Sequence, residues 1–178
     1  MLKAVIFDLD GTLINSFYDW DLIRNKIGVS NLPILTYMNN LKGPFKLKAF
    51  KVLESFEFKA TTKARLRKGI KEILETISKA NLKKAIVTNN TRKNVLYLLK
   101  KWKLSFDVIV TRDDGVWKPS AKPLELAVRR MHLKKNEVIF VGDSNPDLLA
   151  SKKASIEFIS FSQNSGVSDL KSYIEKLC

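Results

Sequence analysis

Acidic residues directly follow two apolar segments, and they are the residues of this sequence best suited to chemistry. The first segment, residues 4–7, leads into Asp8, and Asp10 follows two positions later. The second segment, residues 138–141, leads through a glycine into Asp143, with Asp147 four positions further on. Carboxylates at the edge of an apolar core cost free energy unless something compensates their charge. We therefore predict that these acids hold a metal ion beside a phosphate group.

Clustered carboxylates repel one another, so a hard cation with oxygen ligands is the expected compensation. Mg²⁺ is the usual ion where phosphate is present. Lys118, in the stretch "VWKPS", would neutralise both the carboxylates and a phosphoryl group as a point charge. Thr88 ends another apolar segment, and its hydroxyl can hold phosphate oxygens together with the backbone N–H groups of Asn89 and Asn90. Gly11 permits a close approach of backbone to ligand.

The elements that must position these residues alternate along the chain. Short segments rich in Val, Ile and Phe are predicted strands at 4–7, 84–88, 108–111, 138–141 and 156–159. Amphipathic segments between them are predicted helices at 70–80, 93–102, 123–132, 146–154 and 168–176. This order predicts an α/β fold with a doubly wound parallel sheet. Ligands of such sheets bind outside the carboxyl ends of the strands, so the polar residues named above should converge there.

One region lacks the strand pattern. Between residues 15 and 67 we find no convincing strand, and segments 19–27, 33–40 and 45–58 have helical character. We predict a small all-helical cap over 15–67, inserted into a core domain made of residues 1–14 and 68–178. Within the cap, candidate contributors to specificity are Tyr18, Trp20, Arg24, Lys42 and Lys46.

Composition indicates a globular protein. The 178 residues are 45% hydrophobic and 28% charged, and no apolar run approaches the roughly 18–20 residues that span a bilayer. We therefore expect no membrane partner. The first apolar segment is too short for a secretory signal and is followed at once by acids, which predicts a cytoplasmic location. Cys178 is the single cysteine, so an intramolecular disulfide is excluded. Both a monomer and a homodimer are compatible with the sequence.

The chain is strongly basic, with a formal net charge of +14. Such a field attracts anions, including nucleic acid and phosphorylated metabolites. The lysines are spread along the whole chain without an arginine-rich tract, which favours a lysine-rich solvated surface over a nucleic-acid interface. A nucleic-acid-associated protein, or a nucleotide phosphatase, stays open as an alternative.

The polar motifs together resemble a known family. "DLDGTL" at 8–13, Thr88 at a strand end, Lys118 in "KP" and "GDSNPD" at 142–147 are similar, in order and spacing, to the four motifs of the haloacid dehalogenase superfamily. The resemblance covers nearly the whole chain, and the helical insertion lies where that family places its cap. It implies a Rossmann-like core and a phosphatase similar to phosphoglycolate phosphatases. A phosphomutase of the same superfamily is the alternative within it.

The resemblance also implies roles for individual residues. Asp8 would be the nucleophile that becomes a phosphoaspartate, and Asp10 the general acid and then the general base. The implied Mg²⁺ ligands are Asp8, the backbone carbonyl of Asp10, and Asp143. Thr88, Asn89 and Lys118 would bind the phosphate, and the supporting residues are Asp147, Gly11 and Thr12.

Two assignments have explicit competitors. Lys122 stands in a second "KP" and competes with Lys118 for the phosphate, although the spacing to the following helix favours Lys118. Asp147 could hold the Lys118 ammonium or a metal-bound water, or it could merely cap the helix that follows Pro146.

The substrate expected from the resemblance is a small phosphorylated metabolite.

Overall fold

A computed structural model describes residues 1–162 and 165–177. The chain divides into two compact units, Met1–Asn15 with Arg65–Cys178, and Ser16–Ala64. The first unit is a parallel sheet covered by helices, and the second is helical. The predicted α/β class is confirmed.

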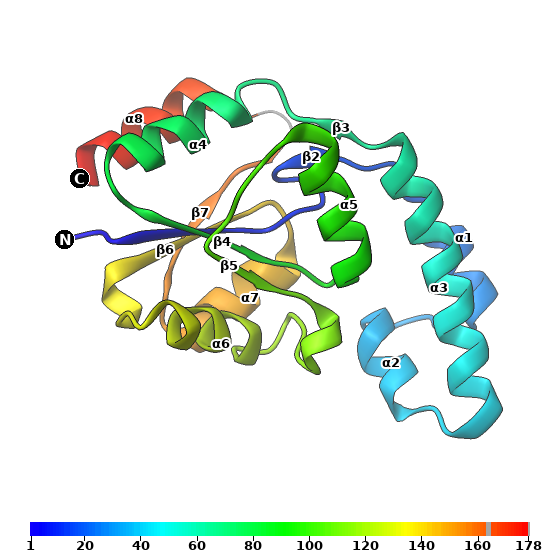
Figure 1. The fold of residues 1–178 in the computed structure, drawn as a ribbon. Coiled ribbons are helices and arrows are strands. Elements are labelled where there is room, and N and C mark those ends of the chain that lie inside the picture. The colour runs from blue at the N-terminus through cyan, green and yellow to red at the C-terminus, as the bar shows by residue number, and fades with distance from the viewer. Residues whose placement is uncertain (163–164, 178) are drawn as a thin grey trace. The chain divides into compact units, whose positions relative to one another are not determined.

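The sheet of the first unit has five parallel strands in the order β5-β4-β1-β6-β7 (Figure 1). Their bounds are β1 Ala4–Phe7, β4 Lys83–Val87, β5 Val108–Val110, β6 Val138–Gly142 and β7 Glu157–Ser160. The central strand β1 is fully buried, and its last residue, Phe7, is in register with Ile86 of β4 and Val141 of β6. After β1 the chain adds β4 and β5 on one side of this strand, and it then adds β6 and β7 on the other side. Sheets with such a reversal of strand order bind ligands beyond the carboxyl ends of the strands at this point.

Helices cover both faces of this sheet. Their bounds are α4 Ile70–Lys79, α5 Arg92–Trp102, α6 Lys122–Met131, α7 Asn145–Ala154 and α8 Val167–Leu177, with short 3₁₀ turns at Arg112–Asp114 and Lys135–Glu137. Helices α6 and α7 pack together on one face, and α4 and α8 pack together on the other (Figure 1). Side chains alternate along a strand, so Ala4 and Ile6 of β1 enter the buried cluster that includes Leu124 of α6 and Ala150 of α7.

The second unit contains α1 Trp20–Ile27, α2 Ile34–Asn40 and α3 Gly43–Lys63, with α1 and α2 both packed on α3. Helix α1 begins where Asp19 accepts a hydrogen bond from the Leu22 N–H, and it ends at Gly28 in the left-handed conformation. Helix α3 is longer than the predicted 45–58 because Ala60 and Thr61 continue its buried stripe beyond Leu53. Among the residues that the structure describes, no helix is both long and apolar enough to cross a bilayer.

A two-stranded antiparallel sheet was not expected from the sequence. Strands β2 Ile14–Asn15 and β3 Arg65–Leu66 pair with each other in the first unit. The prediction of no strand between residues 15 and 67 is therefore wrong at β3. Strands of two residues are too short to show alternation, and only the pairing of distant segments defines them.

Candidate active site

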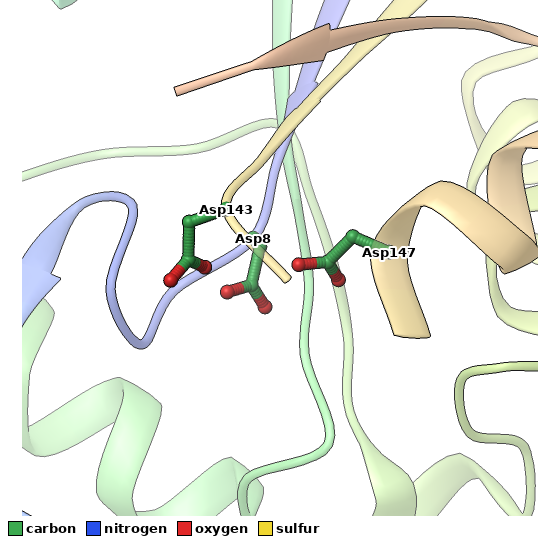
Figure 2. A group of neighbouring side chains, drawn as sticks. All are labelled: Asp8, Asp143 and Asp147. Carbon is green, nitrogen blue, oxygen red and sulfur yellow. The ribbon is translucent and has the colours of Figure 1, made fainter. Parts of the chain in front are cut away.

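Three carboxylates meet beyond the carboxyl ends of β1 and β6. Asp8 directly follows β1, Asp143 directly follows β6, and Asp147 lies in the first turn of α7. One oxygen of each lies within 4.8 Å of the others, and Figure 2 shows the three groups directed toward one another. The ends of two adjacent parallel strands and the helix after the second strand thus bring together residues far apart in the sequence.

Lys118 enters the same cluster from the loop after β5. Its Nζ lies 2.5 Å from Asp8 Oδ1 and 2.5 Å from Asp147 Oδ1, and its side chain is only 4% exposed. Lys122, the competing lysine, is exposed at the start of α6. The structure therefore brings Lys118 to the acids and leaves Lys122 outside the cluster.

The electrostatics of this group favour an additional cation. Three carboxylates against one ammonium leave two negative charges uncompensated when all four side chains are ionised. Burial raises the pKa of the Asp8 carboxyl, and the Lys118 ammonium offsets this only in part. Burial and the charge of Asp147 likewise raise the pKa of Asp143. A divalent ion with oxygen ligands would remove both penalties, so the residues present fit Mg²⁺.

Lys118 and Asp147 behave as an ion pair within this cluster. Burial by itself would lower the pKa of Lys118, but the Asp147 and Asp8 carboxylates outweigh it and raise that pKa. For Asp147, burial alone would raise the pKa, yet the Lys118 ammonium lowers it overall. Both groups are therefore charged at neutral pH.

Asp147 combines the two roles that the sequence left open. One oxygen contacts Lys118, and the other accepts hydrogen bonds from the N–H and the hydroxyl of Ser144, which precedes α7. Gly142 permits this approach, since a Cβ there would lie 2.9 Å from Asp147 Oδ2. Asp147 thus caps the helix and anchors the lysine at the same time. Because both oxygens of Asp147 already have partners, Asp8 and Asp143 are the better candidates for direct metal ligation.

The loop after β1 lies against Asp143. Gly11 has φ +87°, and a Cβ there would lie 2.1 Å from Asp143 Oδ2. The Thr12 hydroxyl donates to Asp143 Oδ1 at 3.2 Å. Two of the three supporting residues expected from the sequence thus position the Asp143 carboxylate: Gly11 leaves room for it, and the Thr12 hydroxyl donates a hydrogen bond to it.

The Gly11→Ala variant should therefore lose activity by a factor of about 100, because it displaces the Asp143 carboxylate by about an ångström or more. The matched control is Gly115→Ala. Gly115 has φ +76° with nothing within 4 Å of its Cβ position, so an alanine there carries a similar backbone strain of about 1–2 kcal/mol without the clash. Steady-state rates and thermal unfolding of both variants check this. Equal activity in the two variants would contradict the role given to Gly11.

Two of the predicted phosphate-binding residues, Thr88 and Asn89, lie directly after β4. The Thr88 hydroxyl accepts a hydrogen bond from the Asn90 N–H at 3.1 Å. Helix α5 begins after both asparagines, at Arg92, with Thr91 as its cap. The Asn89 side chain accepts from the Lys118 N–H at 2.8 Å and donates to the Lys118 carbonyl at 3.0 Å. These two bonds fix the backbone that carries the lysine.

Two side chains of this region, Asn90 and Arg67, make contacts that had no recognisable signal in the sequence. The Asn90 side chain donates to Asp10 Oδ2 at 3.0 Å. The buried Arg67 guanidinium donates to the carbonyls of Thr12 at 3.3 Å and Phe161 at 3.0 Å, and so joins the loop after β1 to the segment after β7. Such contacts depend on segments that only the folded chain brings together.

Several side chains proposed for specificity make contacts inside the second unit. Arg24 donates to two carbonyls of the segment after α1, and Lys46 donates to the Asn39 carbonyl and side chain. The rings of Tyr18 and Trp20 stack with centroids 4.6 Å apart. Lys42 directly precedes α3. Their role in specificity stays a prediction.

The fold and the site together define an α/β enzyme with an acidic centre, neutralised only in part by a lysine, at the ends of its parallel strands. A family model described as haloacid dehalogenase-like hydrolase matches residues 18–161. The chain belongs to this family, as its motifs indicated.

Individual relatives agree with this assignment. An uncharacterized hydrolase of Saccharomyces cerevisiae is 32% identical over 161 residues, which cover 86% of this chain and 74% of the yeast protein. The pyrophosphatase PpaX of Halalkalibacterium halodurans is 31% identical, covering 88% of this chain and 81% of its own. A phosphoglycolate phosphatase of Haemophilus influenzae is 28% identical, covering 85% and 82%.

A solved structure gives the same result. The crystal structure of a HAD-superfamily hydrolase from Ehrlichia chaffeensis superposes with a TM-score of 0.69 at 25% identity, covering 99% of this chain and 98% of that one. The similarity thus extends over both units of the chain and is not confined to the motifs.

Proposed function

We propose that this protein is an Mg²⁺-dependent phosphatase that hydrolyses a small phosphomonoester through a phosphoaspartate on Asp8. The observation that carries the proposal is the contact of the Lys118 ammonium with Asp8, in a group of acids left with two uncompensated negative charges. A nucleophile, a cation for the phosphoryl oxygens and a site for a divalent ion thereby lie within one cluster. Phosphoryl transfer needs positioning and charge stabilisation of this kind.

In the first step an Asp8 oxygen attacks phosphorus, and the bond between phosphorus and the leaving oxygen breaks. Asp10 gives its proton to that oxygen, so the product departs as a neutral alcohol. In the second step water attacks the phosphoaspartate, Asp10 takes the proton back, and Asp8 is regenerated with release of inorganic phosphate. Lys118 and the Thr88 hydroxyl hold phosphoryl oxygens in both steps, and Asp147 keeps the lysine in place.

Asp8, Asp143 and the backbone carbonyl of Asp10 would hold the Mg²⁺. When bound, the ion supplies positive charge that keeps Asp8 ionised and neutralises charge on the phosphoryl group. Removal of the ion should return Asp8 and Asp143 to the state in which burial raises the pKa of each.

The relatives support two substrate classes. The similarity to a phosphoglycolate phosphatase favours a small phosphorylated acid, and the similarity to the pyrophosphatase PpaX favours inorganic pyrophosphate as a second candidate. We propose in addition that the helical unit, Ser16–Ala64, is a cap that excludes water from the reaction and selects the substrate.

The direct test measures phosphate release by the full chain from p-nitrophenyl phosphate, phosphoglycolate and pyrophosphate. We expect release with Mg²⁺, loss of release with excess chelator, and recovery when Mg²⁺ is added back. The relative rates on the last two compounds separate the two substrate classes. Equal rates with Mg²⁺ and with chelator, or no release from any compound, would contradict the proposal.

A further inference from the structure

We infer that Asn90 is a positioning residue, which orients the Asp10 carboxyl toward the departing oxygen and is itself fixed by Thr91 and Asn94. The inference rests on the proposed function, because it gives Asn90 a role beside Asp10, the proton donor of the proposed reaction. The contact that carries it is the hydrogen bond from Asn90 Nδ2 to Asp10 Oδ2, at 3.0 Å. Asp10 lies in a loop beyond a strand end, so its carboxyl needs such a partner to hold one orientation.

The orientation of the Asn90 amide is determined by its other neighbours. Its Oδ1 accepts the backbone N–H of Thr91 at 2.8 Å and the Asn94 amide at 2.9 Å. A backbone N–H can only donate, so the atom that faces Thr91 must be the oxygen. The NH₂ group is therefore forced toward Asp10, where it can only donate.

The chain of amides is also rigid. Asn90 is 3% exposed and Asn94 is 4% exposed, and Asn94 belongs to the first turn of α5. The Asn90 N–H is held by the Thr88 hydroxyl at 3.1 Å. A buried network in which each donor meets an acceptor fixes one geometry. The start of α5 thereby determines the position of a carboxylate that belongs to the loop after β1.

This placement bears on one event, the transfer of the Asp10 proton to the leaving oxygen as its bond to phosphorus breaks. A poor leaving group, such as an alkoxide, needs that proton, whereas p-nitrophenolate departs without it. Misplacing Asp10 should therefore harm alkyl phosphates selectively. kcat/KM is the proper quantity, because it covers the steps through loss of the leaving group and not the later hydrolysis of the phosphoenzyme.

The experiment compares kcat/KM for glycerol 2-phosphate and p-nitrophenyl phosphate in wild type, Asn90→Ala and Asn90→Asp. We expect the alkyl phosphate to lose about 100-fold and the aryl phosphate less than about 10-fold, since general acid catalysis contributes in this range. Asn90→Asp is nearly isosteric and keeps the acceptor for Thr91 and Asn94, but it replaces the donor toward Asp10 by an acceptor. If Asn90→Ala does not fold, Asn90→Asp by itself tests whether Asn90 positions Asp10.

The matched control is Thr91→Ala. It removes the hydroxyl that accepts the Asn94 N–H at 3.3 Å, and so loosens the same helix start, but it keeps the backbone N–H that orients Asn90. Its ratio of alkyl to aryl kcat/KM should equal that of wild type. If wild type is active and the Asn90 variants lose the same factor in kcat/KM on both substrates, the inference is overturned but the proposed function is not. An inactive wild type would instead overturn the proposed function.

Discussion

Replacing Asp8 by asparagine should lower kcat for Mg²⁺-dependent hydrolysis of p-nitrophenyl phosphate by about 1,000-fold or more. The amide has nearly the shape of the carboxylate but cannot attack phosphorus, so no phosphoaspartate forms. Acid-quenched samples examined by mass spectrometry should show a phosphorylated chain for wild type and none for the variant.

Folding stability separates this loss from simple unfolding. Burial raises the pKa of Asp8, so the charge on this carboxylate lowers the stability of the folded chain in the absence of a cation. A neutral amide removes that penalty, so the melting temperature of the Asp8→Asn variant in chelator should equal or exceed that of wild type. Asp169→Asn, at an exposed aspartate of α8, is the control and should retain full activity. Turnover near the wild-type rate in Asp8→Asn would refute the assignment of the nucleophile.

The Lys118→Met variant should lose both activity and stability. The ammonium lies between Asp8 and Asp147, and its removal leaves two buried carboxylates without their partner. We expect a fall in kcat of about 100-fold to 1,000-fold through lost stabilisation of phosphoryl charge. In chelator the free energy of unfolding should drop by about 3–5 kcal/mol, the usual result of breaking a buried ion pair on one side.

Mg²⁺ and a second lysine provide the controls for this variant. Mg²⁺ binds only the folded site, so its addition should raise the melting temperature of Lys118→Met and recover part of the lost stability. Lys122→Met is the matched substitution, since Lys122 also precedes a proline but is exposed. It should match wild type in rate and in melting temperature. A loss in Lys122→Met comparable to that in Lys118→Met would reverse the choice between the two lysines.

Much of the core could be predicted because its determinants are local. The strand β1 has the predicted bounds, and no bound of the other four parallel strands differs from its prediction by more than one residue. The reason is that near-continuous runs of Val, Ile and Phe are typical of strands buried on both faces of such a sheet. The stripe of Ile70, Ile73, Leu74 and Ile77 on α4 follows from helical periodicity in the same way. The pairing β2–β3 could not be predicted, since it joins two-residue segments separated by the whole second unit.

The sequence by itself determined which residue types stand at strand ends, and so the positions of Asp8, Thr88 and Asp143 directly after β1, β4 and β6. It could not choose between the two roles of Asp147, and it could not identify the hydrogen bond from Asn90 to Asp10 or the two hydrogen bonds between Asn89 and Lys118. Periodicity and propensity act over a few neighbouring residues. A hydrogen bond between side chains 80 positions apart depends on the packing of every element between them, which only the tertiary structure settles.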